Sequence, residues 1–465
     1  MSAPPAAKSD ALVVFGATGD LAYKQIFPAL FGLVRDEGLT APIIGVAKEG
    51  WTLDQLKDRA LKSIKEHCRA PDEDTLAKLA HQLRYVSGDY NDPQTFATLK
   101  RALNGAERPA HYLAIPPSLF ATAAAQLSSS GCAAGARLVV EKPFGRNRQS
   151  ARELGEVLAK YFAEENIFRI DHYLGKEPVQ NIIYTRFSNP IFEPIWRREF
   201  VQCIQITMAE SFGVADRGRF YDETGAIRDV LQNHMLQILA LLTMEPPTGE
   251  DHDAQRDQRA SLLKAVRPLA PSDVVRGQYD GYRAVPGVRP QSTVETYVAV
   301  SLIIDNWRWA GVPILIRAGK ELPLTAVEVT VEFKRPPRET FGESARSASS
   351  HLRFRISPDV AIGLGVRVKK AGEQMMGEDV ELMLTRQPAA DRPPYQRLLG
   401  DAMNGVDELF TRQDLIDAQW RVVDGVLDDA APLYFYRPGS WGPREADRLA
   451  GAGRAWRNPE AIEKA

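Results

Sequence analysis

The stretch "ALVVFGATGDLAYKQIFPAL", residues 11–30, carries the strongest indication of the fold. An apolar run at 11–16 leads directly into Gly16, Gly19 and Ala22, in the spacing G-x-x-G-x-x-A, and then into a helical pattern. Glycines let a backbone turn tightly and approach a pyrophosphate, while the helix N-terminus offers free N–H groups. An ordinary tight turn between a strand and a helix is the alternative. The pattern favours a dinucleotide-binding turn, whose predicted cofactor contacts are Gly16, Ala17, Thr18, Gly19, Asp20 and Leu21.

Short apolar runs alternate with amphipathic stretches through the first third of the chain. The expected strands lie at 11–16, 41–47, 83–89, 111–117 and 137–143, with helical patterns between them, for example at 93–103 and 118–129. Alternation of this kind predicts a parallel sheet with helices on both faces and right-handed crossovers. We therefore expect a doubly wound, Rossmann-like α/β dinucleotide-binding domain over residues 1–170.

The pattern changes after residue 170. A long strand-like run at 199–213 and a long helical pattern at 223–244 precede further expected strands at 294–305, 312–319, 326–334, 351–357, 360–369 and 379–386. Successive strands with few helices between them predict a large, mainly antiparallel sheet. We expect an α+β domain for substrate binding and oligomerisation over residues 171–465. The segment 246–290, rich in proline, glycine and charge, is expected to be a surface excursion.

Composition narrows the classes of protein to consider. The 465 residues carry a net charge of -2, which gives no reason to expect a nucleic-acid or membrane partner. No apolar run approaches the ~18 residues of a membrane span, and "MSAPPAAKSD" lacks the features of a secretory signal. Three scattered cysteines, without a CxxC pair, fit a reducing compartment, so we expect a cytoplasmic protein. The seven histidines show no paired metal-ligand spacing, so no essential metal is expected.

The end of the second predicted strand bears on the choice of cofactor. Lys48 follows "IIGVA" where NAD-binding proteins usually carry an acidic residue for the ribose 2′-hydroxyl. A cation there suits a 2′-phosphate and predicts NADP, whereas the adjacent Glu49 weakens the preference and keeps NAD possible. The alternative for Lys48 is a solvated loop lysine.

A second stretch, "RIDHYLGKEPVQN" at 169–181, packs Asp171, His172, Tyr173 and Lys176 into six residues. One acid, one imidazole, one phenol and one ammonium at one point suit a phosphorylated substrate beside an acid–base step. A salt-bridged helix start is the simpler reading, and this stretch alone does not decide between them.

Several short stretches together resemble the glucose-6-phosphate dehydrogenase family. They occur in the family's order and cover nearly the whole chain: "GATGDLA" (16–22), "YLAIPP" (112–117), "EKPFG" (141–145), "RIDHYLGKEPVQN" (169–181), "GAIRDVLQNH" (225–234), "IRAGK" (316–320) and "GSWGP" (439–443). "RIDHYLGK" is very specific to this family, whereas "EKP" also occurs in other sugar dehydrogenases. The resemblance implies oxidation of D-glucose 6-phosphate at C1 to 6-phospho-D-glucono-1,5-lactone, with hydride transfer to NADP. This reaction opens the pentose phosphate or the Entner–Doudoroff pathway.

The resemblance also assigns the acid–base residues. His234 of "DVLQNH" is implied to be the general base, a role that imidazole suits near neutral pH. Asp171 is implied to orient it and to stabilise the imidazolium. Taken alone, His234 would be read as a buried structural histidine.

The implied substrate contacts divide into two groups. The resemblance assigns His172, Tyr173, Lys176 and Lys320 to the 6-phosphate, where charge-assisted hydrogen bonds would bind and orient it. For Lys176 the alternative is an exposed helix lysine.

The remaining contacts concern the sugar ring and the cofactor. The resemblance assigns Lys142 to both, implies a cis peptide bond before Pro143, and assigns Glu210 and Asp229 to sugar hydroxyls. For the two acids the alternative is a surface carboxylate.

The sequence departs from the family pattern at several cations. Gln25 stands where the family commonly has lysine, with Lys24 one position earlier; Thr325 replaces a common lysine or arginine; and Lys48 stands where arginine is usual. These changes leave open a dehydrogenase of another sugar or sugar phosphate, or a catalytically weak nucleotide- or sugar-phosphate-binding relative. Retention of His172 and His234 argues against the second alternative. The apolar faces of the predicted sheet, with the resemblance, favour a homodimer or homotetramer.

Overall fold

The computed structural model describes residues 7–249, 252–338, 340–341, 349–372, 375–385 and 392–461. Chain contacts divide the protein into two compact units. The first comprises residues 1–176, 247–257 and 390–417, and the second comprises 177–246, 258–389 and 418–465. Among the described helices, none is both long enough and apolar enough to cross a membrane.

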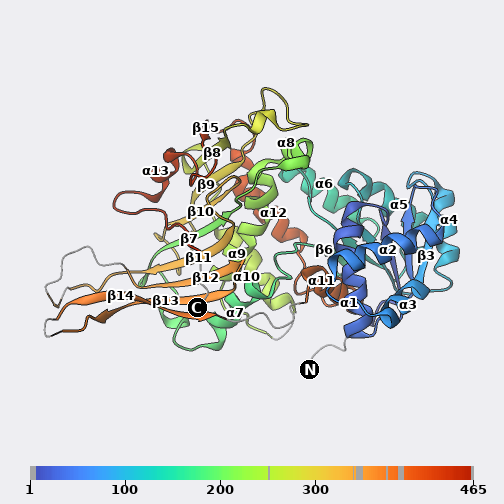
Figure 1. Cartoon of the computed structure of the whole chain (residues 1–465), viewed down its shortest axis with the longest axis horizontal. Helices are drawn as coiled ribbons and strands as arrows, with labels where there is room; N and C mark the ends of the chain where they lie inside the picture. The colour runs from blue at the N-terminus through green and yellow to red at the C-terminus, as the bar shows by residue number, and fades with distance from the viewer. Residues whose placement is uncertain are drawn as a thin grey trace. The chain divides into compact units, whose positions relative to one another are not determined.

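The first unit, in which Figure 1 labels β3 and β6, contains a six-stranded parallel sheet of order β3-β2-β1-β4-β5-β6. Its strands are β1 (Ala11–Phe15), β2 (Ile43–Ala47), β3 (Leu83–Ser87), β4 (Pro109–Leu113), β5 (Arg137–Val140) and β6 (Ile167–Arg169). The strand order reverses direction at β1 and β4, and ligands of doubly wound sheets bind at such a switch point, beyond the carboxyl ends of the strands. The predicted Rossmann-like fold is confirmed.

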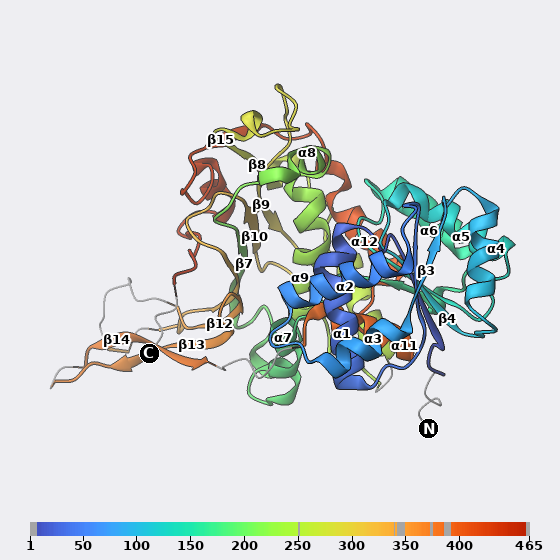
Figure 2. The same ribbon diagram turned by 45° about the vertical axis from the view of Figure 1, so that its right-hand side comes forward.

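Helices cover both faces of this sheet. Figure 2 shows α1, α2 and α3 on one side and α4, α5 and α6 on the other. The bounds are α1 (Phe27–Glu37), α2 (Leu53–His67), α3 (Glu73–Gln82), α4 (Pro93–Ala102), α5 (Phe120–Ser129) and α6 (Arg148–Ala159). Side-chain caps define several starts: Thr52 begins α2, Asp72 begins α3 and Asp92 begins α4. The apolar faces of α4, α5 and α6 bury Phe96, Phe120 and Leu158 against strand residues such as Phe15.

A late segment of the chain returns to the first unit. Helix α11 (Pro394–Asn404) packs against α1, and Ile170 forms an isolated antiparallel bridge with Phe410. The buried Arg137 guanidinium donates to the Met403 carbonyl at 2.9 Å. The late segment therefore contacts both β5 and the residue that follows β6.

The second unit contains a nine-stranded sheet of order β14-β13-β12-β11-β7-β10-β9-β8-β15. Its strands are β7 (Val201–Ala209), β8 (Val274–Tyr279), β9 (Tyr297–Leu302), β10 (Ile314–Gly319), β11 (Ala326–Phe333), β12 (His351–Ser357), β13 (Ala361–Lys369), β14 (Gly377–Thr385) and β15 (Leu433–Tyr436). Two pairs, β10 with β7 and β15 with β8, are parallel, and the other pairs are antiparallel. The predicted large, mainly antiparallel sheet is confirmed. Helix α7 (Glu177–Ser188) packs against β12.

The surface excursion expected at 246–290 is wrong for much of its length. Residues His252–Ala265 form helix α10, and β8 is buried along its whole length inside the large sheet. A strand covered on both faces shows no alternation of polar and apolar residues, so the sequence of β8 lacks the pattern by which a strand is usually recognised. Gly277 within β8 also has a structural reason, because a Cβ there would lie 3.1 Å from both Pro443 Cδ and Tyr297 Cβ.

The long helical pattern at 223–244 is confirmed, but the structure divides it among three successive helical elements. The chain forms α8 (Gly218–Ala226), a π-helix η6 (Ile227–Met235) and α9 (Leu236–Thr243). Gly225, with φ of 69°, interrupts the first of these, and a Cβ there would lie 2.5 Å from Glu295 Oε1. The apolar pattern is helical throughout, but close approach to Glu295 requires a backbone that only glycine adopts easily.

Candidate functional site

The glycine turn lies between β1 and the helical turn η1 (Ala22–Ile26), as the sequence predicts. Gly16 has φ of 77°, and a Cβ there would lie 2.2 Å from the Ala114 carbonyl oxygen, so no other residue fits. Its N–H donates to the Val46 carbonyl at 2.8 Å, and the Gly19 N–H donates back to the Gly16 carbonyl at 2.9 Å. Gly19 and Asp20 are exposed at the start of the helix, whereas Ala17 is buried beneath it. A turn of this shape fits a pyrophosphate at the switch point.

The end of β2 presents a cation with two acids nearby. Lys48 is exposed, and the neighbouring Glu49 side chain accepts a hydrogen bond from Thr18 Oγ1 of the glycine turn at 2.8 Å. Hydrogen bonds from Asn91 hold the pKa of Asp89 below its usual range, and the Lys48 charge adds to this effect. A ligand anion reaching Lys48 would therefore meet two carboxylates nearby.

Arg59 is a cation at this turn that the sequence analysis missed. It lies on α2, with its guanidinium 4.7 Å from the Tyr23 ring centroid and 5.8 Å from that of Trp51. One guanidinium nitrogen donates to the Gly19 carbonyl at 3.5 Å and lies 4.0 Å from the Asp20 carboxylate. No motif contains Arg59; the only available signal was its place on the helix that follows the second strand.

The loop after β6 brings three predicted phosphate ligands together. Asp171 is buried, and its Oδ1 accepts the Tyr173 N–H at 3.0 Å, which fixes a tight turn. The His172 and Tyr173 rings lie 5.0 Å apart, and Lys176 Nζ lies 3.8 Å from the Tyr173 ring centroid. The imidazole and the ammonium therefore both lie close to one phenol ring. Lys142 follows β5 in the same unit, and the Lys142–Pro143 peptide bond is cis, as the resemblance implies.

In the second unit, η6 carries His234 and Asp229. His234 is buried, with 3% of its surface exposed, and its backbone N–H donates to Asn233 Oδ1 at 2.6 Å. Asp229 is partly buried one π-turn earlier. A wide π-turn often marks a functional site, because it displaces side chains from their α-helical positions.

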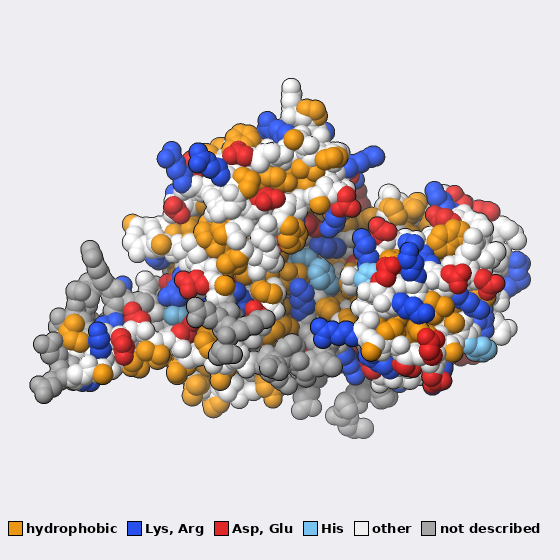
Figure 3. Space-filling model, in the orientation of Figure 1, with side chains coloured by type: hydrophobic (Ala, Val, Ile, Leu, Met, Phe, Trp, Pro, Cys, Tyr) orange, Lys and Arg blue, Asp and Glu red, His pale blue; other side chains and the backbone are white. Residues whose placement is uncertain are grey.

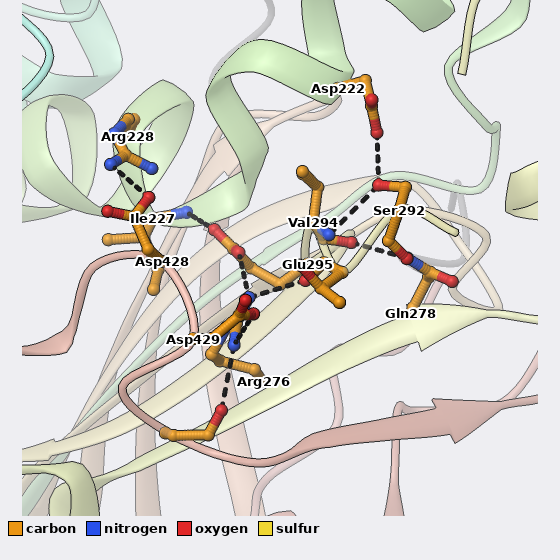
Figure 4. Close-up of polar contacts among 12 residues, drawn as sticks. Asp222, Ile227, Arg228, Arg276, Gln278, Ser292, Val294, Glu295, Asp428 and Asp429 are labelled. Carbon is orange, nitrogen blue, oxygen red and sulfur yellow. Dashed lines mark hydrogen bonds and ion pairs between the residues drawn. The ribbon is translucent and has the colours of Figure 1, made fainter. Parts of the chain in front are cut away.

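A buried ion pair anchors the start of η6 (Figure 4). Glu295 accepts the Ile227 N–H on Oε1 at 3.0 Å, and its backbone carbonyl accepts the Ala226 N–H at 3.0 Å. Arg276 lies 3.3 Å from the Glu295 carboxylate, and both side chains are almost fully buried. Burial raises the pKa of Glu295, and the Arg276 charge opposes that rise. Neither residue belongs to a motif in the sequence.

Lys320 and Glu210 meet at the ends of two parallel strands. The pairing of Gly319 in β10 with Ala209 in β7 makes both chains leave the sheet at the same edge. Lys320 Nζ consequently donates to Glu210 Oε2 at 2.5 Å, and it lies 5.2 Å from the Phe212 ring centroid. Thr325, the departure from the family pattern, accepts the Ser211 N–H at 3.0 Å beside this pair.

Each unit thus assembles part of the predicted site. The first holds the glycine turn, Lys48, Lys142 and the 171–176 loop, and the second holds Asp229, His234, Glu210 and Lys320. The pairing of Asp171 with His234 joins residues of different units and stays a prediction. So does the convergence of Lys176 and Lys320 on one phosphate.

Comparison with known proteins agrees with this architecture. Sequence models described as "Glucose-6-phosphate dehydrogenase, NAD binding domain" and "Glucose-6-phosphate dehydrogenase, C-terminal domain" match residues 13–181 and 183–457. Glucose-6-phosphate 1-dehydrogenase 1 of Mycobacterium tuberculosis is 43% identical over 454 residues, which cover 97% of each chain. The enzyme of Aggregatibacter actinomycetemcomitans is 38% identical, covering 98% of this chain and 99% of that one.

Solved structures show the same similarity. The glucose-6-phosphate 1-dehydrogenase of Mycobacterium avium has a TM-score of 0.92 and 44% identity, covering 98% of this chain and all of that one. A glucose-6-phosphate dehydrogenase solved with its substrate glucose 6-phosphate has a TM-score of 0.90 and 34% identity, covering 97% of this chain and all of that one. Family models over both units and relatives that match along the full length lead to one conclusion: the chain belongs to the glucose-6-phosphate dehydrogenase family.

Proposed function

We propose that this protein oxidises D-glucose 6-phosphate at C1 to 6-phospho-D-glucono-1,5-lactone, with NADP as the preferred hydride acceptor. The observation that carries the proposal is the 171–176 loop, where a buried acid, an imidazole and an ammonium are held together beside a dinucleotide-type sheet. The relatives' names, and the glucose 6-phosphate bound in one of their structures, support the substrate. The lactone product places the reaction at the start of the pentose phosphate or Entner–Doudoroff pathway.

His234 acts as the general base in this proposal. Its imidazole takes the proton of the C1 hydroxyl while the C1 hydride leaves. Asp171 accepts the other imidazole N–H, fixes the tautomer and stabilises the imidazolium that forms. Bound NADP supplies the hydride acceptor, held by the glycine turn and reached by Lys142. Glu210 and Asp229 accept hydrogen bonds from the sugar hydroxyls.

In this proposal, contacts to the 6-phosphate orient the sugar. The proposed donors to its oxygens are His172, Tyr173, Lys176 and Lys320. Charge-assisted hydrogen bonds of this kind are stronger than neutral ones. Binding energy gained far from C1 then holds C1 in position for transfer.

Lys48 gives a moderate preference for NADP over NAD. Lysine is a flexible point charge without the paired donors of arginine. Thr18 holds the Glu49 carboxylate next to it, so part of the attraction for a 2′-phosphate is offset. We therefore propose measurable activity with NAD.

A second copy of this chain is the proposed partner, as a homodimer or as a pair of homodimers in a tetramer. On one face of β13 and β14, three apolar cross-strand pairs lie opposite each other: Ile362 with Leu384, Leu364 with Leu382 and Val366 with Val380. Leu382 is 58% exposed and Leu384 is 73% exposed. Figure 3 shows apolar side chains among charged ones at this end of the sheet. Sedimentation velocity tests the proposal, because Leu384→Asp should shift the protein towards monomer.

The three described cysteines form no disulfide, which fits the proposed cytoplasmic location. Fractionation of source cells with an antibody against the chain tests it.

Formation of reduced nicotinamide, followed by absorbance, tests the activity. The panel contains glucose 6-phosphate, unphosphorylated glucose, other sugar phosphates, and each of the two cofactors. His234→Asn should lower turnover by roughly 10²- to 10⁴-fold. His81→Asn, on the exposed end of α3, is the matched control and should keep parental activity. Faster oxidation of another sugar phosphate would replace the substrate, and no activity with any sugar would leave a binding protein.

A further inference from the structure

We propose that Glu141 and Tyr395 are positioning residues that hold the His172 imidazole in place for the substrate phosphate. The inference rests on the proposed role of His172 in phosphate recognition. All the contacts involved lie within the first unit.

Glu141 is a buried carboxyl at the end of β5, with 8% of its surface exposed. Tyr112, on the neighbouring strand β4, donates its phenol hydroxyl to Glu141 Oε1. The Tyr395 hydroxyl, on α11, makes a second hydrogen bond to the same carboxyl. A side chain from the late returning segment is thereby tied to the carboxyl edge of the sheet.

Tyr395 in turn contacts the His172 imidazole through its ring. Its ring is nearly parallel to that of His172, with an interplanar angle of 12° and centroids 6.4 Å apart. The Tyr173 ring lies 5.0 Å from His172 in a tilted arrangement. The imidazole therefore has two aromatic neighbours, at separations typical of interacting rings. Tyr395 is located by Glu141, and Tyr173 by the Asp171 turn.

Packing alone does not account for an acid at position 141. Burial raises the pKa of Glu141 to about 7, while Tyr112, Lys142 and Tyr395 act to lower it. An apolar side chain would avoid this unfavourable burial, and buried groups with shifted pKa values concentrate at functional sites. Glu141 accepts hydrogen bonds from Tyr112 on the sheet and from Tyr395, whose ring stacks near His172. An apolar residue at position 141 could not hold Tyr395 by a hydrogen bond.

Steady-state kinetics separates positioning from a general structural role. Tyr395→Leu removes the ring and should raise the KM for glucose 6-phosphate by roughly 2- to 10-fold, the value of one aromatic pair. The KM for NADP and kcat should change far less. Tyr395→Phe keeps the ring and loses the hydroxyl, and Glu141→Gln keeps an acceptor oxygen, so both should lie between the parent and Tyr395→Leu. Tyr161→Leu, at the edge of the helix-packed core, is the control for loss of a tyrosine.

A double variant, His172→Asn with Tyr395→Leu, tests whether Tyr395 acts through His172. His172→Asn should raise the KM for glucose 6-phosphate, and adding Tyr395→Leu to it should cause little further rise, because the imidazole to be positioned is gone. Additive effects, or an equal rise in the KM for NADP, would overturn the positioning role. If His172→Asn leaves the KM unchanged, the phosphate assignment itself fails. Circular dichroism and melting temperatures of each variant identify any that are misfolded.

Discussion

Replacing Glu295 with alanine should destabilise the second unit and slow catalysis together. Glu295 is 3% exposed and its partner Arg276 is 2% exposed, so the substitution leaves a buried guanidinium without its main counter-charge. Breaking a buried pair by removing one partner costs about 3–5 kcal/mol. Asp429 still faces Arg276 at 3.3 Å, and the Ala431 carbonyl still accepts from it at 2.9 Å. We therefore expect about 3 kcal/mol, the lower end of that range.

The same change removes the acceptor for the Ile227 N–H at the start of η6. Because η6 carries His234, the turnover of the variant should fall. Its binding of the nicotinamide cofactor should be preserved, because the dinucleotide-binding domain spans residues 13–181. Glu295→Gln keeps the acceptor oxygen and the volume but loses the charge. It should restore most of the turnover and only part of the stability.

Differential scanning calorimetry and steady-state kinetics measure both effects. For a domain of this size, 3 kcal/mol corresponds to a fall of about 6–12 °C in melting temperature. Asp280→Ala, which removes an exposed acid directly after β8, is the control and should change neither quantity. A Glu295→Ala variant that melts within about 2 °C of the parent would refute the anchoring argument.

Three further outcomes are expected. Burial raises the pKa of Glu141 to about 7, so the folded state holds this proton more tightly than the unfolded state, and the resulting stability is lost as pH rises through 7. The glutamine side chain of Glu141→Gln does not titrate, so this variant should not share the parent's loss of stability. The melting temperature of the variant minus that of the parent should therefore increase between pH 5 and pH 8. A constant difference would contradict the raised pKa of Glu141. Lys48→Ala should lower the NADP-to-NAD ratio of catalytic efficiencies by roughly 10-fold with NAD efficiency unchanged, and a parent that prefers NAD would exclude Lys48 as the determinant. Lys176→Ala should raise the KM for glucose 6-phosphate far more than that for NADP; if the parent used unphosphorylated glucose equally well, the phosphate contacts would have to be reassigned.

Local sequence signals determined much of the fold. The apolar run before Gly16 predicted β1, the glycine turn and the following helix, because tight turns and helix starts depend on neighbouring residues. Alternating strands and helices predicted the parallel sheet, and successive strands predicted the mainly antiparallel one. The 171–176 loop was recognisable for the same reason: its acid, imidazole, phenol and ammonium are adjacent in the chain.

Signals failed where a residue's environment comes from distant segments. The strand β8 shows no alternation because other elements bury both of its faces, and Gly225 breaks a helical pattern because Glu295 approaches it. Neither neighbour can be inferred from the local sequence.

By itself, the sequence determined the two sheet types, the glycine turn and the residues available for acid–base and phosphate chemistry. Only the tertiary structure decided which of them share an environment. Lys320 meets Glu210 because β10 and β7 are parallel and in register, and Tyr395 reaches His172 because α11 returns to the first unit. The physical reason is that strand pairing and the burial of a carboxyl such as Glu141 depend on contacts between residues far apart in the chain, which local propensity and periodicity do not record.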